Sequence, residues 1–176
     1  DQMKEYEPEF DQMLFYLPLS GSTFKKVYYD DLLERAVSKF IPAEDLVVPY
    51  SATSLEDAEA IIHVLRVSQN DLRKQQVNGF YKDIDLGEPP VKEDKLKQKE
   101  RELEGIQQNG TEDMYTILEM HVNLDLEGFE DVDVEDGEST GVRLPYIVTI
   151  EEATSEILSI RRNFEEQDPL KKKKDY

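Results

Sequence analysis

The stretch of sequence that decides the fold runs from Tyr115 to Leu126 and reads YTILEMHVNLDL. Successive side chains of an extended chain point to opposite faces, so a period of two separates this stretch into two sets. The alternation predicts an antiparallel strand that is covered on its apolar side, because the other side is mostly polar. The apolar set consists of Thr116, Leu118, Met120, Val122, Leu124 and Leu126.

Two further strands are predicted after this stretch. Val142–Ile150 and Glu156–Asn163 have the composition of strands, and Glu151–Ser155 joins them as a hairpin connection. Three consecutive strands therefore form a meander. Nearer the start of the chain, Phe24–Tyr29 is rich in β-branched and aromatic residues and Arg35–Ile41 alternates, which predicts a separate hairpin.

Two short helices are predicted in the first sixty residues. Apolar side chains recur at helical spacing in Glu9–Tyr16. Pro18 should stop this helix at or just before Leu17, because a proline disfavours the helical conformation of the residue that precedes it. Ser54 with Asp57 three positions later is a capping-box pattern, which predicts one or two helical turns there.

A strand and a helix are predicted next along the chain. The segment from Glu59 to Val67 fits either a helix or a strand, and we favour a strand for its second half because β-branched residues dominate there. Ser68 has an acidic residue three positions later, which predicts the N-terminal cap of a helix that ends near Gly79. Leu72 and Val77 are the expected buried contacts of this helix.

These elements predict an α+β fold in a single domain that spans residues 1–176. Its antiparallel sheet consists of hairpins and the C-terminal meander, with a few flanking helices. Residues 82–112 are expected to form a polar excursion, and residues 127–141 an acidic loop. The sequence starts without an initiator methionine, so we expect it to be a fragment of a longer chain.

The composition excludes several classes of function. The chain has 40 acidic and 21 basic residues, and its formal net charge of -19 has the wrong sign for holding nucleic acid through phosphates. It contains no cysteine and two histidines, which excludes thiol nucleophiles, disulfides and metal sites rich in cysteine or histidine. No apolar run reaches the roughly 18 residues that span a bilayer. We therefore expect no tight DNA binding, no membrane association and no cofactor.

A calcium loop is one interpretation of the stretch from Thr111 to Ser139, which carries 11 acidic residues and no lysine or arginine. The register contradicts it, because Asp136 falls where the calcium loop needs glycine and Val142 where it needs a glutamate. A solvated loop between two strands is the better interpretation. The residues that superficially resemble the ligands are Asp131, Asp133, Glu135 and Asp136, followed by Gly137.

A metal-dependent phosphodiesterase is another interpretation of these acidic residues. Such an enzyme needs carboxylates that converge on divalent ions, and usually a lysine or histidine that handles protons. Nothing in the sequence places such a partner, and His63 and His121 are more typical of strand residues than of general bases. We therefore predict no catalytic, cofactor-binding or metal-binding residue. The available carboxylates are Asp125, Glu127, Asp131 and Asp133.

Aromatic side chains are spread over the predicted strands and helices. Stacking of nucleic-acid bases on them would require a positively charged groove, which this acidic chain lacks. We expect most of them to pack in the core and a subset to anchor a protein interface. The residues are Tyr16, Phe24, Tyr28, Tyr29, Phe40, Phe80, Tyr81 and Tyr146.

Several segments resemble, in the same order, parts of the portal proteins of short-tailed bacteriophages. Their ordered combination carries the resemblance, and they cover most of the chain outside residues 82–112 and 127–141. The segments are LPLSG at 17–21 with FKKVYYD at 24–30, EDLVVP at 44–49, Leu72 with GFY at 79–81, and the hairpin LPYIVTI at 144–150 with ILSIRRN at 157–163.

The resemblance implies a structural protein of the virion, which passes through the host cytoplasm during assembly. Portal proteins form a ring, usually dodecameric, at one capsid vertex, where a terminase motor packages DNA that is later ejected. The implied partners are other portal subunits and capsid or scaffold proteins and, through regions outside this chain, terminase and tail proteins. No catalytic residue is implied, because the ATP chemistry belongs to the motor. The matching segments resemble the outer, mixed α+β wing.

Two other functions remain open from the sequence alone. An acidic domain that captures basic proteins, as a DNA mimic does, would bind tightly and lose affinity steeply with added salt. A divalent-metal phosphodiesterase would require the carboxylates named above to meet in space.

Overall fold

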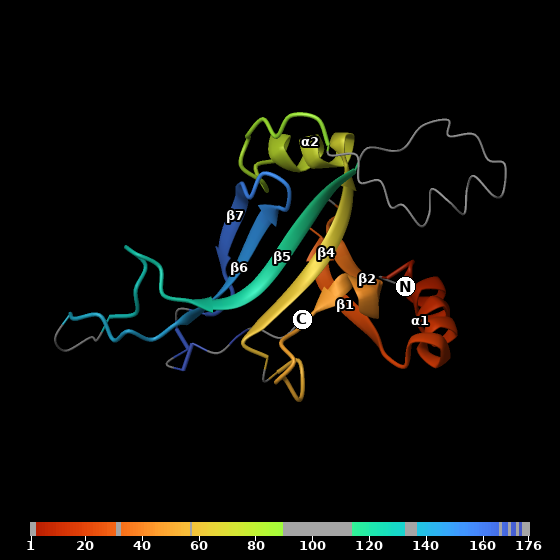
Figure 1. The fold of residues 1–176 in the computed structure, drawn as a ribbon, viewed down its shortest axis with the longest axis horizontal. Helices are drawn as coiled ribbons and strands as arrows, with labels where there is room; N and C mark the ends of the chain where they lie inside the picture. Colours follow the sequence, from red (N-terminus) through yellow and green to blue (C-terminus); the bar gives the residue numbers. More distant parts are fainter. Residues whose placement is uncertain are drawn as a thin grey trace. The chain divides into compact units, whose positions relative to one another are not determined.

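The computed structural model describes residues 3–30, 33–56, 58–89, 114–132, 137–165, 167–168, 170–171 and 173. These residues form helices and two antiparallel sheets, so the predicted α+β class is confirmed (Figure 1). No helix among them is long and apolar enough to cross a membrane. The elements are α1 (Tyr6–Ser20), β1 (Thr23–Asp30), β2 (Arg35–Pro42), the short 3-10 helix η1 (Ala43–Asp45), β3 (Leu46–Val47), β4 (Ala60–Ser68), α2 (Gln69–Val77), β5 (Met114–Leu124), β6 (Leu144–Glu151) and β7 (Ile157–Arg162).

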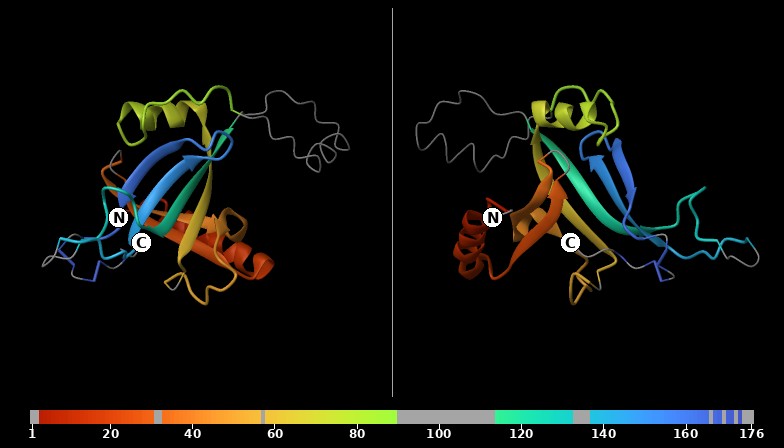
Figure 2. Two further views of the ribbon diagram at one scale, coloured as in Figure 1. Left: turned by 60° about the vertical axis from the view of Figure 1, so that its left-hand side comes forward. Right: turned by 180° about the vertical axis from the view of Figure 1, so that it is seen from behind.

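Strands β1 and β2 form one sheet, and the other has the order β3-β4-β5-β6-β7 (Figure 2). The neighbours β5, β6 and β7 are consecutive in the chain, which confirms the predicted meander. The sequence predicted one domain, and the structure divides into two compact units, of residues 1–64, 120–147 and 161–176, and of residues 65–119 and 148–160. The residues of β4 to β7 are divided between these units.

Helix α1 runs through Pro18, so the predicted stop at Leu17 is wrong. A proline inside a helix cannot donate a hydrogen bond, here to the Leu14 carbonyl, and its ring crowds that carbonyl. Because Pro18 lies in the last turn, the cost is confined to the end of the helix. The helix then ends at Gly21, whose φ of 76° is left-handed and whose N–H bonds to the Leu17 carbonyl at 3.0 Å.

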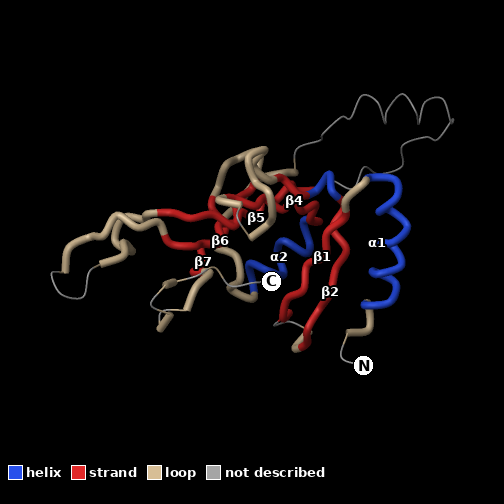
Figure 3. The backbone as a smooth tube through the Cα atoms, turned by 90° about the horizontal axis from the view of Figure 1, so that it is seen from below, coloured by secondary structure: helices blue, strands red, loops and turns tan. Residues whose placement is uncertain are grey.

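The hairpin predicted near the start of the chain is confirmed. Strands β1 and β2 pair along their whole length, from Thr23 opposite Pro42 to Asp30 opposite Arg35. The Asp30 carboxylate accepts a hydrogen bond from the N–H of Leu33 at 3.1 Å, which helps to reverse the chain between the strands. Figure 3 shows α1 running alongside β2.

The helical turns predicted at Ser54 are wrong for the described part of that segment. Residues 50–56 form turns and bends, and Asp57 lies outside the described residues. Serine and threonine side chains compete for backbone hydrogen bonds, and no apolar stripe holds a short helix here. The strand that follows is confirmed, and it also includes the half that the sequence left ambiguous, because β4 begins at Ala60.

Helix α2 begins directly after the predicted cap, Ser68, and ends at Val77, close to the predicted Gly79. The Ser68 hydroxyl oxygen accepts a hydrogen bond from the N–H of Asp71 at 3.2 Å. Gly79 has a φ of 74°, and the N–H groups of Gly79 and Phe80 bond back to carbonyls of the last helical turn, each at 3.0 Å. This pair of bonds is a Schellman motif.

The buried contacts of α2 differ from the prediction at one position. Leu72 is 4% exposed, as predicted, but Val77 is 73% exposed. A spacing of five residues leaves two side chains about 140° apart around a helix, so Val77 faces away from Leu72. Gln76 is buried instead, and its amide donates to the carbonyls of Lys82 and Ile84.

Replacement of Ser68 by alanine should remove the cap of α2. We expect Ser68→Ala to lower the free energy of unfolding by about 1 kcal/mol, because an N–H of the first turn loses its acceptor. Urea unfolding followed by circular dichroism measures the change. Ser51→Ala is the control, since Ser51 begins no helix. Equal losses in the two variants would show that the cap contributes nothing.

The core of the second unit lies on the mostly polar face of β5. From the sequence, the opposite, apolar face was expected to be the covered one. Tyr115 and Ile117 are 3% and 0% exposed, and Glu119 on the same face is also buried. The apolar face is half-buried, so β5 is covered on both sides and its alternation does not reveal the deeper side. The buried cluster comprises Leu72, Tyr81, Tyr115, Ile117 and Leu158, with Leu65, Val67 and Leu86 packed against it.

Two polar side chains of this unit, Tyr115 and Glu151, make hydrogen bonds to nearby segments. The Tyr115 hydroxyl donates to the Gly87 carbonyl. Burial raises the pKa of Tyr115, and nearby carboxylates, led by Asp85, raise it further. The Glu151 carboxylate accepts hydrogen bonds from the N–H and the hydroxyl of Thr154, at 2.7 and 2.8 Å, and so closes the turn between β6 and β7.

Candidate functional site

The acidic loop connects β5 to β6 and is described at residues 125–132 and 137–143. Its two arms meet at an isolated bridge between Val132 and Ser139. The described part is therefore an irregular hairpin. Residues 90–113, which include most of the predicted polar excursion, lie outside the described residues, as do three residues of the superficial calcium pattern: Asp133, Glu135 and Asp136.

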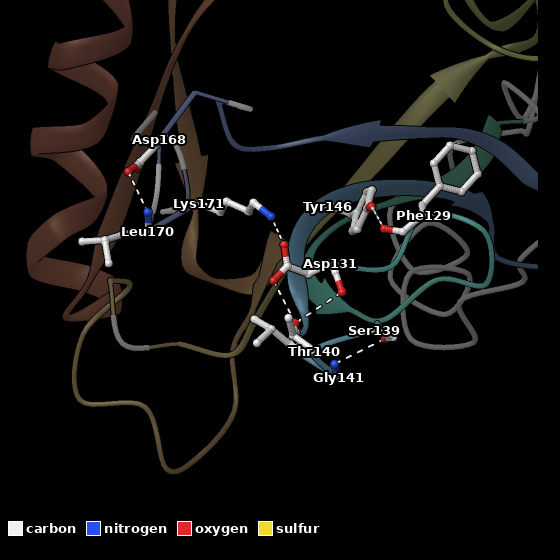
Figure 4. Close-up of polar contacts among 10 residues, drawn as sticks. Phe129, Asp131, Ser139, Thr140, Gly141, Tyr146, Asp168, Leu170 and Lys171 are labelled. Atoms are coloured by element: carbon white, nitrogen blue, oxygen red, sulfur yellow. Dashed lines mark hydrogen bonds and ion pairs between the residues drawn. The ribbon is translucent and has the colours of Figure 1, made fainter. Parts of the chain in front are cut away.

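Asp131 is bound to other residues of the chain through its main chain and its carboxylate (Figure 4). Its Oδ2 accepts a hydrogen bond from Thr140 Oγ1 at 2.8 Å, and its carbonyl accepts one from the Thr140 N–H at 2.8 Å. Its Oδ1 forms an ion pair with Lys171 Nζ. The two side chains are 15% and 30% exposed, so the pair is partly shielded from water. These contacts fix the loop to the segment that follows β7.

The described carboxylates do not converge on a common point. No group of three or more histidine or acidic side chains within the described ranges is placed to hold a metal ion. Asp125, Glu127 and Asp131 therefore do not form such a group, and Asp133, the fourth residue of the phosphodiesterase set, lies outside the described residues. The enzyme hypothesis gains no support from their geometry.

Both histidines lie on strands, as the sequence predicted. His63 is in β4, opposite Leu46 of β3, and His121 is in β5. Each is half-buried and has an interaction partner within the chain. These surroundings are typical of structural histidines.

Aromatic side chains fix the base of the acidic loop. Tyr146 is 3% exposed, its hydroxyl donates to the Phe129 carbonyl at 3.3 Å, and its ring makes an edge contact with Phe164. The Arg162 guanidinium lies 5.8 Å from the centre of the Phe129 ring. The predicted core role thus holds for Tyr146. It also holds for Tyr81. Tyr16, Tyr29 and Phe80 are exposed and belong to the subset outside the core, for which an interface role stays a prediction.

A second candidate surface, which the sequence did not predict, lies where α1 covers the outer edge of β2. Glu9 Oε2 accepts a hydrogen bond from the N–H of Phe40 at 2.6 Å, and Glu5 Oε1 accepts one from the N–H of Ser38 at 3.4 Å. The Glu5 carboxylate also forms an ion pair with Arg35 at 2.6 Å. We call this set of interactions the α1–β2 contact.

The regular spacing of residues along a helix and along a strand explains the α1–β2 contact. Residues four apart in a helix are separated by about 6.0 Å along its axis. Residues two apart in a strand are separated by about 6.6 Å, and their N–H groups point to the same side. The spacing between Glu5 and Glu9 along the helix axis is therefore close to the spacing between Ser38 and Phe40 along the strand. Their carboxylates take the place of a neighbouring strand and block the edge of β2.

Ring contacts add to the α1–β2 contact. The rings of Tyr16 and Phe40 stack with 5.4 Å between their centres. Lys25 of β1 places its Nζ 3.6 Å from the centre of the Tyr6 ring and 5.2 Å from that of Phe10. The sequence held a signal for this surface, two glutamates four positions apart, but nothing in it identified the strand that they face.

Helix α1 nevertheless buries none of its residues. Single exposed apolar residues are normal on a protein surface, whereas several along one 15-residue helix indicate a contact surface. The exposed large side chains are Tyr6 (47%), Leu14 (47%), Phe15 (69%), Tyr16 (41%), Leu17 (41%) and Leu19 (72%). We call Leu14, Phe15, Leu17 and Leu19 the exposed apolar side chains of α1.

The ion pair at Glu5 predicts a dependence of stability on pH. The hydrogen bond from Arg35 holds the pKa of Glu5 below its ordinary value of 4.5. A carboxyl with a lowered folded-state pKa stabilises the fold above its unfolded pKa, and this contribution is lost as the pH falls through the folded pKa. We therefore expect wild type and Glu5→Gln to differ in free energy of unfolding at neutral pH and to converge below pH 4.5.

Urea unfolding at a series of pH values measures this difference. Glu7→Gln is the matched control, because Glu7 lies in the first turn of α1 and is exposed. A difference between wild type and Glu5→Gln that stays constant down to about pH 3 would show that the ionised carboxylate does not stabilise the α1–β2 contact.

No family model matches this chain, and no curated protein matches it.

Proposed function

We propose that this chain is a structural component of a bacteriophage portal ring at the capsid vertex. It supports DNA packaging and ejection through contacts with neighbouring subunits and with the capsid or scaffold. The ordered segments between residues 17 and 163 that resemble portal proteins support this assignment, and the α+β fold is in keeping with the wing of that family.

The observation that carries the proposal is the set of exposed apolar side chains of α1. Four large apolar side chains within six residues are 41–72% exposed in the single chain. Exposure of these side chains to water is unfavourable, and association with another protein surface relieves it. A subunit of an assembly needs exposed apolar surface for its contacts, whereas a binding or catalytic function of the acidic loop does not explain it.

The charge of the chain also suits a protein beside a DNA channel. Proteins that neutralise phosphates hold DNA in a salt-dependent manner, and adhesion of that kind would hinder sliding. A chain with a formal net charge of -19 repels a polyanion instead.

Complementation in infected cells tests the proposal. A phage with a stop codon in the coding sequence of this chain should produce no DNA-filled particles, and wild-type protein supplied in trans should restore them. Asp125→Asn should restore them equally, because Asp125 is exposed and no carboxylate chemistry is involved. Phe15→Asp with Leu19→Asp should fail while keeping the circular dichroism of the wild type, since both side chains are exposed.

Either of two outcomes would contradict the proposal. DNA-filled particles formed without the chain would show that it is not needed for packaging. A folded Asp125→Asn protein that fails to complement, and that has lost a magnesium-dependent nuclease activity of the wild type, would replace the structural role by an enzymatic one.

An acidic module that binds basic partners is the second candidate, and the ion pair between Asp131 and Lys171 favours it. This pair shows that the loop accepts an ammonium group. Backbone hydrogen bonds also lower the pKa of Glu130, which keeps a further carboxylate charged. Titration with a lysine-rich peptide at low and high salt tests this function. Tight binding that weakens steeply with salt would support it, and absence of binding at low salt would exclude it.

A further inference from the structure

We propose that α1 is an exchangeable arm, which covers the β2 edge of its own chain here and covers the β2 edge of a second copy in an assembly. A second copy carries an identical helix, so it re-forms the same interactions across the junction. These include the bond from the Phe40 N–H to Glu9 and the ion pair between Arg35 and Glu5. The inference depends on the contacts of α1 and does not require the portal assignment.

The connection between α1 and β1 is suited to act as the hinge. The helix ends at Ser20 and the strand begins at Thr23, so two residues separate them. One of these is Gly21, whose φ of 76° lies in the left-handed region that glycine enters readily. Short connections of this kind favour the exchange of a preceding element between copies. Rotation at Gly21 redirects the helix without a change in the β1–β2 hairpin.

The exposed apolar side chains of α1 provide the driving force for exchange. Own-chain docking satisfies the polar groups of the α1–β2 contact but leaves Leu14, Phe15, Leu17 and Leu19 exposed. Exchange keeps the polar interactions and brings a second copy close to the helix, so that apolar surface of these side chains can be removed from water. Own-chain and exchanged forms therefore differ mainly in this burial, and a high local concentration favours the exchanged form.

The geometry of exchange also sets the type of assembly. A copy that gives its arm to one neighbour and receives the arm of another makes two different contacts. Such heterologous contacts close into rings when the rotation between copies permits it. Two copies that swap arms reciprocally form a closed dimer instead. In both cases the occupant of the β2 edge is the helix of another copy.

Cross-linking between singly labelled chains tests the arm. The chain has no cysteine, so introduced cysteines react alone. Full-length Tyr16→Cys and Phe40→Cys chains, whose rings stack in the α1–β2 contact, are mixed at rising concentration and treated with a short bis-maleimide. We expect a linked dimer of one chain of each kind, identified by mass, with a yield that rises with concentration.

A matched control separates exchange from non-specific association. Phe15→Cys replaces Tyr16→Cys, because Phe15 is the neighbouring residue and its side chain is 69% exposed. Equal yields for the two positions would overturn the proposal. It would also be overturned if no mixed dimer formed at any concentration while the chain with both Tyr16→Cys and Phe40→Cys was linked internally.

A second pair of variants keeps the test decisive if either ring substitution prevents folding. Glu5→Cys and Arg35→Cys occupy the ion pair of the same contact, and Glu7→Cys is then the control. The same outcomes apply to this pair. Failure of exchange in both pairs would refute the proposal that α1 is an exchangeable arm. The proposed portal function would still be tested separately, because the complementation test does not measure exchange.

Discussion

Leu158→Ala is expected to lower the free energy of unfolding by about 2–5 kcal/mol, the range for a buried leucine whose truncation leaves a cavity. Leu158 is 1% exposed and belongs to the buried cluster of the second unit, with Tyr115 and Ile117. Small domains are stabilised by only about 5–15 kcal/mol in total, so this loss is a large fraction of the whole. Urea unfolding at neutral pH measures it.

Ile160→Ala is the matched control for this prediction. Ile160 lies two residues further along β7 and is 46% exposed. A substitution at such a surface position should change the free energy of unfolding by about 0.5 kcal/mol. Similar losses at Leu158 and Ile160 would contradict the placement of Leu158 in the core.

Tyr146→Ala is expected to cost about 3–5 kcal/mol, because it removes a buried ring. Tyr146 is 3% exposed, contacts the Phe164 ring, and donates its hydroxyl to the Phe129 carbonyl at the base of the acidic loop. Tyr146→Phe keeps the ring and should cost about 1 kcal/mol, the net contribution of a typical hydrogen bond. The two variants therefore separate packing from hydrogen bonding.

Tyr29→Ala is the control for the ring, since Tyr29 is 62% exposed. Urea unfolding of all the tyrosine variants gives the comparison, with the unfolding slope checked for two-state behaviour. If Tyr146→Ala were no more destabilising than Tyr29→Ala, the ring of Tyr146 would not be part of a packed core.

The elements that the sequence predicts well are those with a local cause. Ser68 and Gly79 bound a helix because their side-chain and backbone properties act within one helical turn. The β1–β2 hairpin and the meander follow from strand composition and short connections, which bring consecutive strands together.

The failures arise where the outcome depends on residues far away in the chain. Val77 was expected to be buried, but the position that α2 presents to its surroundings is Gln76. The deeper side of β5 was assigned wrongly because covering on both sides hides the alternation. Helix α1 was expected to end before Pro18, because proline generally destabilises a helix. The energetic cost of this proline is small, because it lies in the last turn of the helix.

The candidate surfaces were predictable only in part. The acidic loop is evident from composition, but the partners of Asp131 are Thr140 in the loop and Lys171, 40 residues away from Asp131. Likewise, Glu5 and Arg35 are 30 residues apart in the chain. Pairs of this kind depend on the tertiary arrangement, which local propensity does not encode.

We propose that this chain acts by contact within a phage particle, at a single vertex. Immunogold electron microscopy of purified virions, with an antibody raised against this chain, locates it in the particle. We expect gold at one vertex of each labelled capsid, where the tail attaches. Gold spread over all vertices, or virions without label beside labelled host cytoplasm, would contradict it.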